Sequence, residues 1–155
     1  MVILGIDPGT ATTGFGVIRK IKRDLKCLDY GLIKTSPKSS TPERLDKLYT
    51  ELTKLIRKHK PDILGVENIY FFKNLKTALP VSQAKGVILL AAARAKVPIY
   101  EFTPLQVKMT VTGYGRAEKK QIQKMIGHLL GLKELPKPDD AADALGVAIC
   151  SALAL

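Results

Sequence analysis

The sequence lacks tryptophan, contains only two cysteines and has no apolar run long enough to span a bilayer. Cys27 and Cys150 stand far apart, outside any metal-binding Cys-x-x-Cys pattern, which argues against a disulfide-stapled scaffold. The longest apolar stretch, residues 141–155, contains Asp143 and is shorter than the roughly 20 residues that a membrane helix needs. No charged leader or cleavage site precedes Val2–Ile6, which argues against a signal peptide. We therefore expect a soluble, cytoplasmic protein with no membrane contact.

Acidic residues are also scarce: 14 Asp and Glu are opposed by 25 Lys and Arg, and the formal net charge is +11. A strongly basic domain attracts polyanions, of which nucleic acid is the commonest. A basic cytosolic enzyme or a ribosome-associated protein would show the same excess. The charge therefore favours nucleic acid as the partner, without identifying a fold.

The 155 residues contain no internal repeat, low-complexity tract or linker, which predicts one domain over residues 1–155. Apolar runs and β-branched segments predict strands at residues 2–6, 13–20, 27–35, 63–67 and 98–102. Apolar residues at helical spacing predict helices between and after the later strands, with Thr41, Thr103 and Asp139 as N-caps and Pro80 in a first turn. This order predicts an α/β fold, a mixed five-stranded sheet flanked by helices on both faces.

Four acidic residues stand out by their places in this predicted fold. Asp7 and Glu67 each end a buried strand, and side chains beyond the carboxyl ends of parallel strands can share one site. Asp140 and Asp143 are three residues apart in the last predicted helix, so both project from one face. The sequence after them is so apolar that the helix must be largely buried, where an unpartnered acid is costly.

Convergence of these four carboxylates would be unfavourable without a cation, because neighbouring negative charges repel one another. Mg²⁺ prefers hard oxygen ligands and keeps several waters or substrate phosphates. Two such ions about 3.5–4 Å apart can activate a water and stabilise the leaving oxygen of an in-line phosphoryl displacement. An acidic centre in an otherwise basic protein therefore predicts a nuclease that uses Mg²⁺ or Mn²⁺.

Simpler structural roles compete with this interpretation. Asp7 alone would most often be a turn residue, Asp139 a helix N-cap, and Asp140 a first-turn acid that complements the helix dipole. Asp143 is harder to explain, because the apolar sequence around it offers no partner. The aromatic run Tyr70–Phe72 would usually belong to a core, but at a strand end it is also placed to stack on bases.

Seven motifs occur in order along nearly the whole chain: Gly5-Ile6-Asp7-Pro8-Gly9, Thr13-Gly14-Phe15-Gly16, Val66-Glu67, Ser82-Gln83-Ala84-Lys85-Gly86-Val87, Gln106-Val107-Lys108, Ala117-Glu118-Lys119 and Asp140-Ala141-Ala142-Asp143-Ala144-Leu145. Together they resemble the RuvC family of Holliday junction resolvases. An Asp-Pro-Gly turn alone also occurs in other proteins of this superfamily, whereas all seven motifs in register are specific.

The resemblance implies a ribonuclease H-like fold, a homodimer, two divalent cations in each active site, and symmetric nicking of two strands across a four-way DNA junction. By match, Asp7, Glu67, Asp140 and Asp143 are the metal-binding acids, with Asp7 expected to bridge the two ions. Asp139 adds an acid beside the motif, so the choice of Asp140 as the ligand rests on its spacing to Asp143. A branch-migration helicase complex is implied as a partner.

The resemblance also assigns residues that meet DNA. Lys119 matches a basic residue that assists catalysis at the scissile phosphate, and Lys108 matches another basic residue near the DNA. Tyr70 falls where the family carries an aromatic residue that stacks near the junction centre, a position held by Phe in some members. Arg116, in the loop before Lys119, is expected to contact DNA as well.

Two other functions remain open on the sequence. Asp7-Pro8-Gly9-Thr10 also satisfies the Asp-x-Gly-Thr turn of actin-like phosphotransferases and ATPases. Those proteins generally place the nucleotide between two such domains, and this chain has room for one. The other alternative is a non-catalytic module that binds branched nucleic acid. The four acids argue against it, because without a bound metal they would only repel phosphate.

Overall fold

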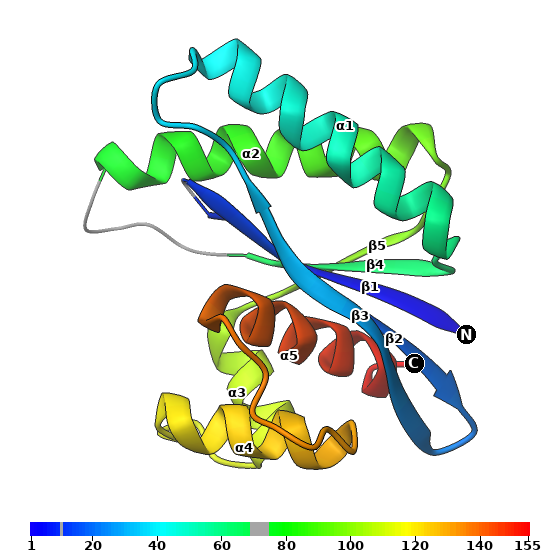
Figure 1. Ribbon diagram of the computed structural model, residues 1–155. Helices are drawn as coiled ribbons and strands as arrows, with labels where there is room; N and C mark the ends of the chain where they lie inside the picture. The colour runs from blue at the N-terminus through cyan, green and yellow to red at the C-terminus, as the bar shows by residue number, and fades with distance from the viewer. Residues whose placement is uncertain (10, 69–74) are drawn as a thin grey trace.

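A mixed five-stranded sheet forms the centre of the computed structural model, which describes residues 1–9, 11–68 and 75–155 (Figure 1). Its strands are β1 (Val2–Asp7), β2 (Thr12–Ile21), β3 (Asp24–Lys34), β4 (Ile63–Glu67) and β5 (Ile99–Phe102). The order across the sheet is β3-β2-β1-β4-β5; β1, β2 and β3 are antiparallel, and β4 and β5 continue in parallel from β1. The predicted strands are confirmed, the largest shift being the earlier start of β3.

Helices cover both faces of the sheet, as predicted. They are α1 (Thr41–His59), α2 (Leu75–Arg94), α3 (Pro104–Thr112), α4 (Lys119–Leu129) and α5 (Asp139–Leu153). In Figure 1, α1 and α2 lie together on one face, while α5 lies against the other face with α3 and α4 beyond it. Buried apolar side chains form one cluster on each side, with Leu52 and Ile88 in the first and Ile126 and Leu145 in the second. The sheet therefore separates two hydrophobic cores.

The N-caps of the helices agree with the sequence only in part. Thr103 caps α3 as predicted, in a capping box with Gln106. At α1, however, the N-cap is Ser40 and not Thr41, which is the first helical residue. The Ser40 hydroxyl accepts a hydrogen bond from the Glu43 amide, and the Glu43 carboxylate accepts one from the Ser40 amide. This reciprocal pair satisfies two exposed backbone donors, so the helix starts one residue earlier than predicted.

The prediction that Pro80 lies in the first turn of its helix is also wrong. Helix α2 begins at Leu75, which places Pro80 inside it. The residues before the proline, Leu-Lys-Thr-Ala-Leu, are mostly good helix formers and extend the helix ahead of it. The proline ring lacks an amide hydrogen, so one intrahelical hydrogen bond is missing at this point.

A row of glycines brings α5 close to the sheet. Gly5 of β1 pairs with Gly16 of β2 on one side and with Gly65 of β4 on the other. A methyl group on Gly5 would overlap the carbonyl oxygen of Ala144, and one on Gly65 would overlap the Ser151 hydroxyl. The helix backbone therefore rests directly on the strand backbones, which fixes the height of α5 above the ends of β1 and β4.

Two expectations about the whole chain can be compared with this structure. Cys27 and Cys150 are both free thiols, in agreement with a fold that needs no disulfide. Among the described residues, every helix is too short or too polar to cross a membrane.

Candidate active site

Three segments carry the predicted acids to the same edge of the sheet. Asp7 is the last residue of β1 and Glu67 the last of β4, and these strands are parallel neighbours, so their carboxyl ends meet. Asp140 and Asp143 lie in the first turns of α5, which starts above that edge. All four acids predicted from the sequence are therefore in one region, although they come from distant parts of the chain.

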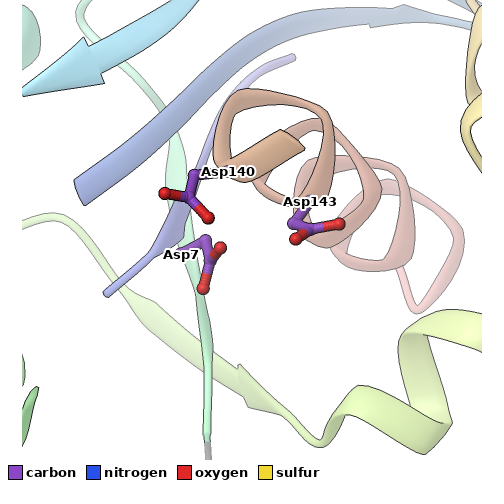
Figure 2. Close-up of side chains that lie close together, drawn as sticks. All are labelled: Asp7, Asp140 and Asp143. Carbon is purple, nitrogen blue, oxygen red and sulfur yellow. The ribbon is translucent and has the colours of Figure 1, made fainter. Parts of the chain in front are cut away.

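Asp7, Asp140 and Asp143 form the closest group, which we call the acid triad. One carboxylate oxygen from each lies within 4.8 Å of the others. Figure 2 shows Asp7 at the strand end, close to Asp140 and Asp143 on the helix. Glu67 joins through Asp7, since the two side chains share a hydrogen bond. Asp7 is thus the member that lies close both to the helix acids and to Glu67.

Burial and mutual repulsion make full ionisation of this group unfavourable. Burial, followed by the nearby charge of Glu67, raises the pKa of Asp7 to about 9. Burial is also the main cause of the raised pKa of Glu67 and of Asp143. Without a cation, the Asp7–Glu67 pair therefore holds a proton at neutral pH, shared through its hydrogen bond.

The shared proton should make the stability of the metal-free protein depend on pH. The folded pKa of Asp7 lies above its unfolded value, so the folded chain binds more protons between the two values and loses stability as pH rises. We expect the free energy of unfolding in chelator to fall from about pH 4 to about pH 9, by at most about 1.4 kcal/mol per pH unit. Asp7→Asn should flatten that slope in denaturant titrations. Equal slopes for the two proteins would contradict the shared proton.

A cavity of about 300 Å³ lies beside the acids and contains two lysines. It is lined by Glu67, Lys108, Lys119 and Asp143 together with apolar side chains. The Lys119 ammonium lies 3.1 Å from Asp139 Oδ2 and 3.9 Å from Asp143 Oδ2. Partial burial opposes the change, but the hydrogen bond to Asp139 and the charge of Asp143 raise the pKa of Lys119 and keep it protonated.

The structure corrects two expectations about these acids. Asp143 does have a partner, Lys119, which the apolar sequence around Asp143 did not reveal because α4 precedes α5 by a long loop. Asp139 is not the N-cap of α5: Pro138 holds that position, and Asp139 is the first helical residue. Its carboxylate accepts a hydrogen bond from Gln123 and pairs with Lys119, outside the acid triad. Geometry thus places Asp140, rather than Asp139, in the triad.

One residue of the site was missed entirely. The Thr12 hydroxyl donates a hydrogen bond of 2.7 Å to Asp140 Oδ2. Thr12 opens β2, and nothing in its sequence neighbourhood distinguishes it from the adjacent Thr13. Only a contact between positions 128 apart reveals it.

One of the predicted DNA-binding residues lies away from the cavity. Arg116 is exposed in the turn between α3 and α4, outside the cavity lining as far as the described residues define it. Tyr70 lies outside the described residues. Lys108, half-buried on α3, does line the cavity and faces Glu67.

The donor set fits a divalent cation. The triad and Glu67 supply only carboxylate oxygens, the ligands that Mg²⁺ and Mn²⁺ prefer. A bound cation would replace the proton that burial otherwise forces onto the Asp7–Glu67 pair, and would relieve the repulsion that raises these pKa values.

Comparison with known proteins adds an independent line of support. Residues 3–151 match the family model of the crossover junction endodeoxyribonuclease RuvC. The chain is 54% identical over 152 residues to the protein of that name from Alkaliphilus metalliredigens, covering 98% of this chain and 93% of the relative. It is also 54% identical over 150 residues to the one from Syntrophomonas wolfei, covering 97% of this chain and 87% of the relative. Among solved structures, T. thermophilus RuvC in complex with a Holliday junction substrate superposes with a TM-score of 0.93 at 36% identity, covering 98% of this chain and 93% of that one.

Proposed function

Because the chain belongs to the RuvC family of crossover junction endodeoxyribonucleases, we propose that it resolves four-way (Holliday) DNA junctions by hydrolysing phosphodiester bonds at the acid triad. The activity belongs to one ribonuclease H-like domain, residues 1–155, and serves the recombination and repair of DNA. The observation that carries the proposal is the meeting of Asp7, Asp140 and Asp143 at the end of β1, in a chain that matches the family over 149 of its residues, 3 through 151. The relative solved with a Holliday junction substrate supports junction DNA as the substrate.

Divalent cations are the proposed cofactor, two Mg²⁺ ions in each active site, with Mn²⁺ as a possible substitute. When bound, they supply an activated water and compensate the charge on the leaving oxygen. Asp7, Glu67, Asp140 and Asp143 are the proposed ligands. Asp7 is proposed as the ligand shared by both ions, since its carboxylate is close both to Glu67 and to the two helix acids.

The basic side chains of the protein have a separate role. We assign Lys119 to the scissile phosphate, because its ammonium lies in the cavity beside Asp143 and remains protonated. A fixed positive charge at this point attracts the phosphate and offsets charge that develops during hydrolysis. Lys108, which lines the same cavity, is proposed to contact the DNA backbone, and Arg116 to contact it farther out. Tyr70 remains the proposed stacking residue at the junction centre.

The excess of positive charge is consistent with binding of a large polyanion. A chain of net charge +11 can attract DNA phosphates to the surface around an acidic centre. Because each phosphate contact releases counterions, DNA binding should weaken as the salt concentration rises. Symmetric nicking of two strands requires two active sites, so the proposed working form is a homodimer. A branch-migration helicase complex is the proposed protein partner, on the basis of family membership.

The function can be tested with a labelled four-way junction and a linear duplex of matching sequence, each incubated with Mg²⁺ or with chelator. We expect paired, symmetric nicks in the junction alone, lost with chelator. Tight junction binding in Mg²⁺ without cleavage would favour a binding module instead. Equal cleavage of both substrates would preserve the nuclease and remove the specificity for branched DNA.

A further inference from the structure

We infer that Thr12 is a positioning residue for Asp140: its hydroxyl holds that carboxylate in the orientation in which it binds a divalent cation. This inference rests on the proposed cation site at the acid triad. It concerns a residue outside the acids and lysines that the family resemblance assigns.

The carboxylate of Asp140 accepts a short hydrogen bond from an uncharged donor. Thr12 Oγ1 donates to Oδ2 at 2.7 Å, at a partly buried position. A hydrogen bond to one oxygen limits rotation of the carboxylate and leaves Oδ1 available to a cation. Because the hydroxyl carries no charge, it does not compete with a cation as an ammonium group would. Partners of this kind orient metal ligands in many proteins.

The other members of the triad are held differently. Asp143 has the Lys119 ammonium 3.9 Å away, and Asp7 shares a hydrogen bond with Glu67. Within the described chain, Thr12 is the neutral side chain that donates to the triad. Asp140 is therefore the acid whose orientation depends on a hydroxyl.

The backbone around Thr12 is fixed from two sides. Thr12 pairs with Lys34 in the β2–β3 ladder, and the neighbouring Ala11 carbonyl accepts a hydrogen bond of 3.1 Å from the Thr35 amide. A methyl group on Gly9 would overlap the Thr12 carbonyl oxygen, so the chain after Asp7 folds back tightly on the start of β2. This strand start has little freedom to move.

The first turn of α5 is pressed against the same strand. A methyl group on Gly14 would overlap the carbonyl oxygen of Asp140, so β2 and the helix touch backbone to backbone two residues after Thr12. Threonine is branched at Cβ, which restricts its χ1 angle and keeps the hydroxyl aimed in one direction. A stiff donor on a fixed strand therefore meets a carboxylate on a fixed helix.

The test is a titration with Mn²⁺ by calorimetry, performed on the full chain without DNA. Thr12→Val removes the hydroxyl and keeps the shape, and we expect it to weaken Mn²⁺ binding roughly 10-fold or more. Thr12→Ser keeps the hydroxyl and should bind Mn²⁺ within about 3-fold of the unaltered protein, with looser positioning because serine is not branched. Thr53→Val, the same substitution on α1 away from the acids, is the matched control and should not change binding.

A second readout separates positioning from folding. In chelator, Thr12→Val should unfold at a denaturant concentration close to that of the unaltered protein. Valine has nearly the volume of threonine, and the hydrogen bond that is lost is only partly buried. The Mg²⁺ concentration for half-maximal junction cleavage should rise with the loss of Mn²⁺ affinity, and high Mg²⁺ should restore most of the rate.

The outcomes distinguish this inference from the function on which it rests. If the unaltered protein binds Mn²⁺ and Thr12→Val binds it equally well, Thr12 has no positioning role and the inference is overturned. Weakened binding in both Thr12→Val and Thr12→Ser, without loss of stability, would also overturn it, since the hydroxyl would not be what matters. If the unaltered protein itself binds no Mn²⁺ at the acids, the cation site of the proposed function fails instead.

Discussion

Replacing Asp7 by Asn should abolish junction cleavage while leaving junction binding unchanged. Asn removes one of the negative charges that the triad offers to a cation, at the position that lies close both to Glu67 and to the helix acids. Metal ions contribute several kcal/mol to such reactions, which corresponds to a loss of roughly 10³-fold in rate. The measurement is single-turnover cleavage of a labelled four-way junction in Mg²⁺, with binding measured separately in gel-shift titrations.

The fold of this variant should be preserved. The Asn amide can donate to Glu67 in the way that the protonated Asp7 carboxyl does, so the hydrogen bond survives the change. Asp46→Asn, at an exposed position on α1, makes the same chemical change away from the site and should cleave normally. Cleavage by Asp7→Asn at the unaltered rate would remove the acid triad from the mechanism.

The second large effect is expected from Gly5→Ala. Its new methyl group would meet the Ala144 carbonyl oxygen and, at 2.5 Å, the Ala148 amide nitrogen, both in the backbone of α5. Neither group can rotate away, so the helix must move off the sheet. We expect a loss of roughly 3 kcal/mol in the free energy of unfolding and a Tm lower by roughly 6–12 °C. Cleavage should fall too, because α5 carries Asp140 and Asp143.

Gly127→Ala is the matched control for this substitution. Gly127 lies in α4, where a new methyl group would meet its nearest atoms, in Pro136 and Glu134, at 3.9 and 4.0 Å, which is ordinary van der Waals contact. Alanine is the better helix former, so this variant should gain up to about 1 kcal/mol. Equal denaturant midpoints for Gly5→Ala and the unaltered protein would show that α5 does not rest on the β1 backbone.

Several features of the site can be predicted from short stretches of the sequence. A buried apolar run that ends in an acid predicts where β1 and β4 stop, and the parallel arrangement of those strands brings Asp7 and Glu67 to one edge. The spacing of Asp140 and Asp143 within one helix predicts that they share a face. The boundaries of β4 agree with the prediction residue for residue.

Two helix N-caps differ from those that the sequence predicts. The sequence predicts Thr41 and Asp139, but the cap positions belong to Ser40 and Pro138. Cap choice depends on which side chain completes a hydrogen-bonded pair or finds another partner. For Asp139 that partner is Lys119, from another helix.

The sequence by itself determined the order of the strands and helices, the four acids and the family, because periodicity, strand ends and motif spacing are local properties of the chain. The tertiary structure decided which acid of the pair Asp139 and Asp140 joins the triad, that Lys119 faces Asp143, and that Thr12 holds Asp140. It also decided the raised pKa of Asp7, which arises from burial and from charges on other elements. Hydrogen bonds, ion pairs and desolvation act between groups that only packing brings together, so no local pattern encodes them.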